Sequence, residues 1–353
     1  MNPAERAIRD RIARDGPLPL AEFMRTALAD PEHGYYRTRD PIGRGGDFVT
    51  APEISQAFGE LIGLWCAVTW RLMGAPAAVR LVELGPGRGT LMADALRAAA
   101  PVPGFRAALS IHLVETSPRL AEVQRAALGG AGARWHESLS GVPSGPLLLI
   151  ANELFDALPV DQYVRAADGW RRRAVTVGAA GDLSFADIAC AQPDLPDAPA
   201  GTVCEVSDEA IALAAAIGRR VAMDGGAALI VDYGPLQRST GRSLQAVRGH
   251  AFADVLDAPG TADLSAHVDF AALADAARAA GARAFGPVTQ RAFLRRLGIE
   301  VRLARLAATG GSAAESGARL IDPAGMGTLF KVMALTHPGL PAPAGFEETE
   351  ERC

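Results

Sequence analysis

Three glycines alternate along one turn of the chain, at Gly85, Gly87 and Gly89. They lie between a short apolar run and a helical pattern, and in this strand-turn-helix setting glycines let the backbone bend sharply and approach a ligand closely. The spacing is not the G-x-G-x-x-G of nicotinamide and flavin sites, because Thr90 stands where the third glycine would be. Glu83 adds a carboxylate two positions before the turn. The strand-turn-helix setting and the nearby acid together favour a ligand-binding turn over a simple turn.

A second acidic residue ends the next apolar run. Glu115 follows the predicted strand 109–115, and an acid at this strand end can accept hydrogen bonds from both hydroxyls of a ribose. It lies 30 residues after Gly85 (115 − 85), longer than the usual interval of about 20. We attribute the extra length to the loop 101–104.

Polar side chains also follow the buried apolar run 146–151, at Asn152, Glu153 and Asp156. Strand ends at the switch point of a doubly wound sheet border the ligand crevice. We expect Glu153 to clamp a substrate, Asn152 to orient it, and Asp156 to be a second carboxylate. Two of these positions have an alternative structural interpretation: Asn152 can satisfy a turn, and Asp156 can cap a helix.

The elements that would position these residues alternate between strand and helix from residue 79 onward, which predicts an α/β fold with a doubly wound, Rossmann-like sheet. A helix is predicted at 288–297 and a long ordered loop at 234–264. We expect four parts: a helical N-terminal extension and lid at 1–77, a core with helical insertions at 78–160 and 205–337, a β-hairpin and loop insertion at 161–204, and a flexible tail at 338–353.

Composition excludes several classes of protein. The net charge of −5 disfavours a nucleic-acid binder. The four cysteines form no C-x-x-C pair, so we predict no metal site. No apolar run reaches the length of a membrane span. Residues 1–15 resemble a transit peptide in their arginines but carry three acids, so we expect an ordinary first helix and a cytoplasmic protein. The oligomeric state stays open.

Two levels of resemblance follow from these motifs. The segment Glu83–Thr90 looks like motif I of the class I methyltransferases that use S-adenosylmethionine (SAM). A narrower set of stretches resembles the MidA-like methyltransferases, namely 46–60, 151–159, 232–234, 244–246, 263–270 and 326–332. The resemblance runs from about residue 5 to residue 335. Leu154 and Ser265 replace the phenylalanine and threonine that are frequent in the family, which puts little in doubt.

The resemblance implies SAM as cofactor. In this fold the glycine turn passes under the methionine moiety, Glu83 would help to hold its amino group, and Ser138 and Leu139 stand where adenine is contacted. The family includes the mitochondrial factor that dimethylates an arginine of a core complex I subunit. The resemblance thus implies that this chain is a protein arginine N-methyltransferase that acts on a respiratory complex I subunit or its bacterial counterpart.

Two further segments are candidates for the site. The stretch 47–56 is rich in hydrogen-bonding groups and is predicted to fold over the cofactor as a lid, with Thr50 and Ser55 close to SAM. Glu53 can instead balance a helix dipole. His267 is flanked by two acids and is a candidate to orient substrate, although a lone histidine is more often structural.

Three other functions stay open from the sequence. The first is a small-molecule N- or O-methyltransferase with the same cofactor. The second is a non-catalytic assembly factor that binds SAM only as a ligand. The third, an NAD-dependent dehydrogenase, is disfavoured by the glycine spacing.

Overall fold

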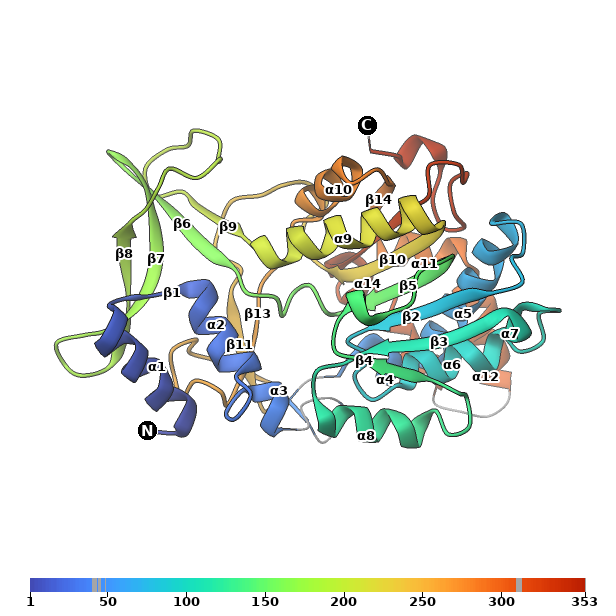
Figure 1. Ribbon diagram of the computed structural model, residues 1–353, viewed down its shortest axis with the longest axis horizontal. Coiled ribbons are helices and arrows are strands. Elements are labelled where there is room, and N and C mark those ends of the chain that lie inside the picture. Colours follow the sequence, from blue (N-terminus) through green and yellow to red (C-terminus); the bar gives the residue numbers. More distant parts are fainter. Residues whose placement is uncertain (40–42, 44–45, 48, 309–312, 353) are drawn as a thin grey trace. The chain divides into compact units, whose positions relative to one another are not determined.

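The computed structural model describes residues 1–39, 43, 46–47, 49–308 and 313–352 (Figure 1). The chain divides into two compact units. The first unit holds 1–48, 156–211 and 238–269, and the second unit holds 49–155, 212–237 and 270–353. This differs from the expected parts, because 49–77 belongs with the core and the hairpin insertion belongs with the N-terminal helices.

The second unit contains most of the alternating strands and helices. Its elements are β2 (Val79–Leu84), β3 (Leu109–Val114), β4 (Arg134–His136), β5 (Leu147–Asn152), β10 (Gly226–Tyr233), β14 (Arg283–Thr289), β15 (Phe330–Thr336), α4 (Ala51–Ile54), α5 (Gln56–Leu72), α6 (Thr90–Ala99), α7 (Phe105–Ala108), α8 (Pro118–Ala127), α10 (Phe270–Ala279), α11 (Gln290–Arg296), α12 (Ile299–Ala308), α13 (Ala313–Ala318), α14 (Met326–Leu329), and the 3-10 turns η1 (Leu139–Gly141) and η2 (Glu348–Glu350).

One seven-stranded sheet organises this unit, in the order β14-β15-β10-β5-β2-β3-β4. The strands from β4 to β10 are parallel, while β15 runs antiparallel to both of its neighbours. The chain moves outward from β2 to β4 and then returns to β5 on the other side of β2. The topological switch therefore lies between β2 and β5, where a doubly wound sheet binds its ligand.

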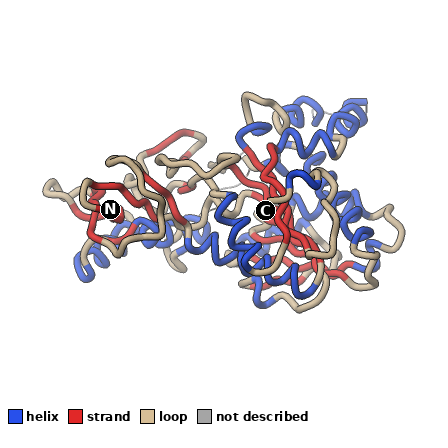
Figure 2. The backbone as a smooth tube through the Cα atoms, turned by 90° about the horizontal axis from the view of Figure 1, so that it is seen from above, coloured by secondary structure: helices blue, strands red, loops and turns tan. Residues whose placement is uncertain are grey.

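Apolar burial explains why these segments form the central strands. Every residue of β5 is buried, and β10 is buried up to its last residue, as expected for parallel strands covered on both faces. Figure 2 shows the strands of this unit as a layer with helices on either side. The predicted doubly wound α/β fold is confirmed.

The C-terminal segment packs against the second unit instead of forming the flexible tail that we expected. Phe346 is buried, and its ring lies 5.5 Å from that of Phe293. Arg283 donates to the Glu351 carboxylate at 2.6 Å, and Glu351 also forms a β-bridge with Phe285. Burial of an aromatic ring and a bidentate ion pair hold this segment in place.

The first unit is built from short helices and two small sheets. Its elements are α1 (Pro3–Asp15), α2 (Leu20–Ala29), α3 (Tyr35–Thr38), β1 (Leu18–Pro19), β6 (Asp161–Ala166), β7 (Gly169–Val177), β8 (Leu183–Ala189), β9 (Val203–Val206), β11 (Gln245–Arg248), β12 (Ala251–Ala253) and β13 (Asp263–Ser265). Helix α9 (Asp208–Asp224) begins in this unit and continues into the second.

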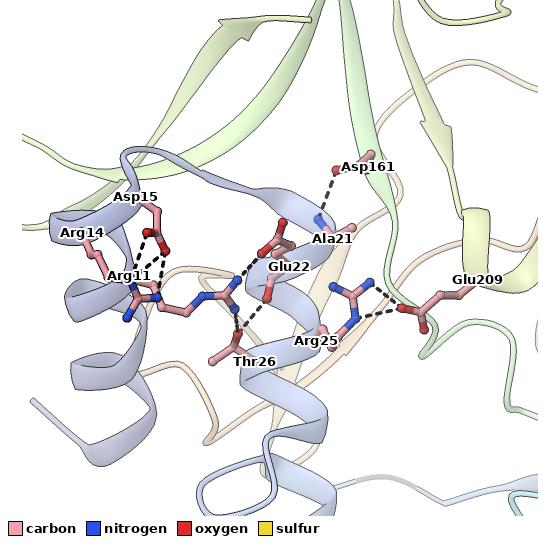
Figure 3. Close-up of polar contacts among 9 residues, drawn as sticks. All are labelled: Arg11, Arg14, Asp15, Ala21, Glu22, Arg25, Thr26, Asp161 and Glu209. Atoms are coloured by element: carbon pink, nitrogen blue, oxygen red, sulfur yellow. Dashed lines mark hydrogen bonds and ion pairs between the residues drawn. The ribbon is translucent and has the colours of Figure 1, made fainter. Parts of the chain in front are cut away.

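Polar contacts join the helices of the first unit to its larger sheet (Figure 3). Arg11 of α1 donates to Thr26 of α2 at 3.1 Å. The amide of Ala21, in the first turn of α2, donates to Asp161 of β6 at 3.2 Å. The first contact links the two N-terminal helices, and the second links α2 to a strand 140 positions later in the chain.

Two segments differ from the secondary structure that we expected. The predicted helix 288–297 begins as the end of β14, which pairs with β15, and only 290–296 is helical. The predicted loop 234–264 contains the hairpin β11–β12 and most of β13. None of the described helices is long and apolar enough to cross a membrane.

Candidate functional site

The glycine turn joins β2 to α6 at the carboxyl edge of the large sheet. Gly85, Gly87 and Gly89 have φ angles of 60°, 53° and 82°, in the left-handed region that glycine adopts without steric cost. A Cβ at Gly85 would lie 2.9 Å from Cδ1 of Leu154. The turn therefore presents bare backbone directly beside the residues that follow β5.

Glu83 is the second-to-last residue of β2, and its carboxyl group is enclosed. It is 3% exposed, and its Oε2 accepts no hydrogen bond from the described residues. Burial raises the pKa of Glu83 to about 8, because the charged form is poorly solvated there. The pKa of the Cys66 thiol on α5 is also raised. Burial is the main cause, and the negative charge of the Glu83 carboxylate is the second. A cationic ligand group would satisfy this carboxylate. That Glu83 holds the amino group of SAM stays a prediction.

The end of β5 carries a strained turn. Glu153 has φ +50°, a conformation that costs about 1–3 kcal/mol for a residue with a side chain and that is typical of functional sites. Asn152 is 9% exposed; its Nδ2 donates to Glu153 Oε1 at 3.1 Å, while its Oδ1 is buried with no partner in the part of the chain that is described. Asn152 Oδ1 is therefore an acceptor that a ligand can satisfy.

Asp232, at the end of β10, holds this turn in place. Its side chain is fully buried, and its Oδ2 accepts hydrogen bonds from the amides of Leu154 at 3.2 Å and Phe155 at 2.9 Å. Its Oδ1 accepts from the amide of Tyr233 at 2.9 Å. No role was predicted for Asp232 from the sequence. Two signals could have identified it: an acid at the end of a buried strand, and its place in 232–234, one of the stretches that resemble the MidA-like family.

The described part of the predicted lid comprises Asp47 and 49–56, and the segment 49–56 contacts the residue after β5 and the first residue of α6. The amide of Ala51 donates to Glu153 Oε1 at 2.9 Å, and the hydroxyl of Thr90 donates to Glu53. Thr90 is the first residue of α6, so the Glu53 carboxylate lies at the positive end of that helix. Phe48, within the predicted lid, lies outside the described residues.

Thr50 and Ser55 were predicted to lie close to SAM. Thr50 precedes α4 and makes no capping hydrogen bond with its side chain. Ser55 is 4% exposed, and its Oγ accepts from the amide of Ala57 at 3.3 Å, which caps α5. The cap gives Ser55 a structural role, and its proximity to the cofactor stays a prediction.

Glu115 lies directly after β3 in a network that the sequence did not reveal. Its Oε1 accepts from the amide of Ser117 at 2.7 Å, and its Oε2 accepts from Gln124 Nε2 at 2.9 Å. Gln124 Nε2 also donates to the carbonyl of Gly87 at 2.8 Å. The network connects the predicted ribose carboxylate to the glycine turn. Nothing in the residue type of Gln124 could have identified it.

Ser138 and Leu139 follow β4, at the same edge of the sheet as Glu115. Ser138 Oγ and Ser140 Oγ are 2.8 Å apart, and Leu139 is 8% exposed. The carbonyl of Leu139 accepts from Arg220 at 3.3 Å. This position after β4 is compatible with an adenine contact, which stays a prediction.

Asp156 and His267, the other two catalytic candidates, belong to the first unit. Asp156 is 8% exposed, and its carbonyl accepts from the amide of Ala266 at 2.9 Å. His267 is exposed, and its amide donates to Ser243 Oγ at 2.8 Å. Asn152 and Glu153 belong to the second unit, so a catalytic role of Asp156 and His267 beside them stays a prediction.

A second buried acid, Asp263, lies close to Asp156 in the first unit. The hydroxyl of Tyr36 donates to Asp263 Oδ1 at 2.7 Å. Burial, followed by the charge of Asp156, raises the pKa of Asp263 to about 7. Within the described ranges, no group of histidines, cysteines and acids is arranged to hold a metal ion.

The residues of the second unit fit SAM in chemical type. The turn offers bare backbone at Gly85, Glu83 offers an enclosed carboxylate oxygen for a cation, and Glu115 offers acceptors for hydroxyls. Asn152 and Glu153 lie beside this turn with acceptor oxygens at the switch point of the sheet. This arrangement can bind a sulfonium nucleoside and present a polar acceptor to it.

Comparisons with known proteins agree with this chemistry. A family model of S-adenosyl-L-methionine-dependent methyltransferases matches residues 61–288. The mitochondrial protein arginine methyltransferase NDUFAF7 of Danio rerio is 37% identical, over 93% of this chain and 85% of that protein. The mouse protein of the same name is 40% identical, over 86% of this chain and 76% of its own length.

A solved structure is also similar over nearly the whole chain. A Burkholderia thailandensis protein crystallised with S-adenosyl-homocysteine superimposes with a TM-score of 0.86 at 30% identity, covering 99% of this chain and 95% of that one. It confirms the predicted fold class. Our cytoplasmic assignment is contradicted, because the curated relatives are named as mitochondrial proteins.

Proposed function

Since this chain belongs to the family of S-adenosyl-L-methionine-dependent methyltransferases and its cofactor is SAM, we propose that it methylates arginine side chains of a respiratory complex I subunit. The arginine specificity is supported by relatives at 37–40% identity that carry the name protein arginine methyltransferase. The complex I subunit rests on the resemblance to the MidA-like family, whose mitochondrial member acts on such a subunit.

The observation that carries the proposal is the end of β5. Asn152 Oδ1 is a buried acceptor with no partner in the described structure, and Glu153 stands next to it in a strained conformation. A guanidinium group has only donors and keeps its charge above pH 12. Acceptor oxygens that grip its planar fork are therefore what an arginine methyltransferase requires beside its cofactor.

We assign the cofactor to the turn between β2 and α6. The backbone at Gly85–Gly89 and the Glu83 carboxylate would hold its amino-acid end, and Glu115 its ribose hydroxyls. When bound, SAM supplies a methyl group that is already activated for displacement. The protein has then to exclude water, orient the acceptor nitrogen and accept the proton that this nitrogen loses.

Within this assignment, Asn152 and Glu153 orient the guanidinium. Asn152 Oδ1 accepts an N–H of the substrate, and the Glu153 carboxylate polarises the nitrogen that is methylated and then takes its proton. Glu153 Oε1 already accepts from Ala51 at 2.9 Å and from Asn152 at 3.1 Å, which fixes the carboxylate in one orientation. The contact with Ala51 also attaches the segment 49–56 to the site.

The test uses purified protein with methyl-labelled SAM and complex I from a strain that lacks this enzyme. The proposal expects label in one subunit, as methylated arginine, and loss of that label with Glu153→Gln. Label in a small metabolite and none in protein would instead support a small-molecule methyltransferase. If Glu153→Gln restored complex I assembly in cells as fully as the parent protein, a non-catalytic assembly factor would be favoured.

A further inference from the structure

One amide side chain joins the two ends of the assigned cofactor site. Gln124 of α8 is fully buried, and its Nε2 donates both to the carbonyl of Gly87 at 2.8 Å and to Glu115 Oε2 at 2.9 Å. Gly87 lies in the turn assigned to the methionine end, and Glu115 is assigned to the ribose. The two contacts therefore use both N–H groups of the amide.

The third contact of Gln124 fixes which way its amide points. The indole Nε1 of Trp135 donates to Gln124 Oε1 at 2.9 Å. Because an indole N–H can only donate, it selects the oxygen of the amide and turns the nitrogen toward Gly87 and Glu115. Arg125 lies 4.9 Å from the centre of the Trp135 ring, in a cation–π contact that helps to hold the indole.

The last glycine of the turn makes this approach possible. A Cβ at Gly89 would lie 3.4 Å from Cα of Gln124 and 3.6 Å from its Cγ. Helix α8 thus packs against the turn at Gln124 itself. Glycine is therefore favoured at position 89 for two reasons: it leaves room for α8, and it adopts the positive φ of +82° without strain.

We propose that Gln124 is a positioning residue for SAM, which fixes the Glu115 carboxylate for the ribose and the Gly87 carbonyl for the turn as one unit. The amide of Ser117 holds Glu115 Oε1 and Gln124 holds Oε2, so that the plane of the carboxylate is set from both sides. The inference rests on the proposed placement of SAM. It adds that affinity depends on a residue that does not itself need to touch the cofactor.

The experiment measures S-adenosyl-homocysteine binding to the full chain by calorimetry. Gln124→Met keeps the size of the side chain and removes its polar contacts, and we expect affinity to fall about 10- to 100-fold at any pH between about 6 and 8. Gln124→Glu places a second carboxylate against Glu115. Its loss should be at least as large at about pH 8 and should recover toward pH 6, because a close carboxylate pair binds a shared proton.

Two controls separate this inference from the placement of SAM. Arg119→Gln, on the exposed side of α8, changes the charge by the same amount as Gln124→Glu and should leave affinity within about twofold of the parent. Glu115→Gln removes the assigned ribose carboxylate and should weaken binding. If it does, while both Gln124 variants bind within about twofold of the parent, the role of Gln124 is refuted and the site stands.

If Glu115→Gln also binds like the parent, the placement of the cofactor itself is wrong. Should either Gln124 variant unfold, Trp135→Phe keeps a smaller aromatic ring at this position and removes the N–H that orients the amide. The proposal then expects a loss of about 3- to 10-fold, and unchanged binding by a folded Trp135→Phe protein would overturn it.

Discussion

Replacement of Asp232 by asparagine should damage catalysis more than it damages the fold. Asp232 is buried and accepts hydrogen bonds from the amides of Leu154, Phe155 and Tyr233 at 3.2, 2.9 and 2.9 Å. Asparagine keeps one acceptor oxygen and turns the other position into a donor. At least one of the three backbone N–H groups therefore loses its partner.

The expected loss of stability follows from the lower-energy orientation of the new side-chain amide in the Asp232→Asn variant, of the two that are possible. With the oxygen toward Leu154 and Phe155, only the amide of Tyr233 is left unsatisfied, at a cost of about 1–3 kcal/mol. The melting temperature should then fall by a few degrees. The strain at Glu153 is worth about 1–3 kcal/mol, which is comparable to the hydrogen bonds that maintain it. The neutral amide oxygen that remains holds Leu154 and Phe155 less strongly than the carboxylate did, because hydrogen bonds to an ionised acceptor are stronger. The turn can then relax, and kcat/KM should fall about 10- to 100-fold.

The assay is methyl transfer from labelled SAM to complex I of an enzyme-deficient strain, combined with calorimetry of S-adenosyl-homocysteine binding and thermal unfolding. Asp275→Asn, in an exposed pair with Arg278, is the matched control and should change none of the three. We expect Asp232→Asn to lose turnover while cofactor affinity changes less. A variant that is less stable but transfers methyl groups at about the parental rate would refute the positioning role.

Three further predictions concern Glu83, Gly89 and the C-terminal segment. Burial raises the pKa of Glu83 from 4.5 to about 8, so the native state holds a proton that the unfolded state has released, and stability falls as pH rises through that interval. The melting temperature of Glu83→Gln should therefore be higher than that of the parent at about pH 8 and equal to it near pH 4.5. The variant should also bind S-adenosyl-homocysteine more weakly. Equal melting temperatures of the two proteins at both pH values would contradict this. Gly89→Ala should lose affinity for S-adenosyl-homocysteine. The control is Gly130→Ala, which has a similar φ of +76° but no atom within 4 Å of an added Cβ, and it should lose stability only. Equal losses of binding in the two variants would count against the contact with Gln124. Phe346→Ala should cost about 3–5 kcal/mol in the free energy of unfolding by denaturant, and a cost near zero would mean that this segment does not pack in solution.

The parts of the site that were predictable from sequence are those with local signals. The turn at Gly85–Gly89 is visible in the sequence because glycine affects the conformation of its own backbone. The acids are visible because each lies at or next to the end of an apolar run, namely Glu83, Glu115 and Glu153. The strands β3 and β5 form within one residue of the predicted ranges 109–115 and 146–151. Buried parallel strands depend on a continuous apolar run, which a sequence displays directly.

The residues that were missed act across long distances in the chain. Asp232 holds Leu154 from 78 positions away, and Gln124 holds Gly87 from 37. Neither residue type has an intrinsic preference for such a role, because the role exists only when the sheet brings the strand ends together. Asp156 was grouped with Glu153 because it follows it by three positions; it is assigned to the other unit, and its catalytic role stays a prediction.

The same reasoning explains the C-terminal segment and the first two residues of the predicted helix 288–297. Strand β14 forms because β15 offers it a hydrogen-bonding edge, and that edge lies more than 40 residues later. Residues 338–352 are rich in proline, glycine and acids, a composition typical of tails. They are ordered by Phe346 and by the partners of Arg283, which a local reading cannot detect.

The central claim, that Asn152 and Glu153 present an arginine to SAM bound at the glycine turn, is tested most directly by mass spectrometry of complex I. Subunits would be compared from a deletion strain that carries either the parent enzyme or Glu153→Gln. The account predicts methylated arginine on one subunit with the parent and unmodified arginine at that position with the variant. The same methylation in both strains, or in neither, would contradict it.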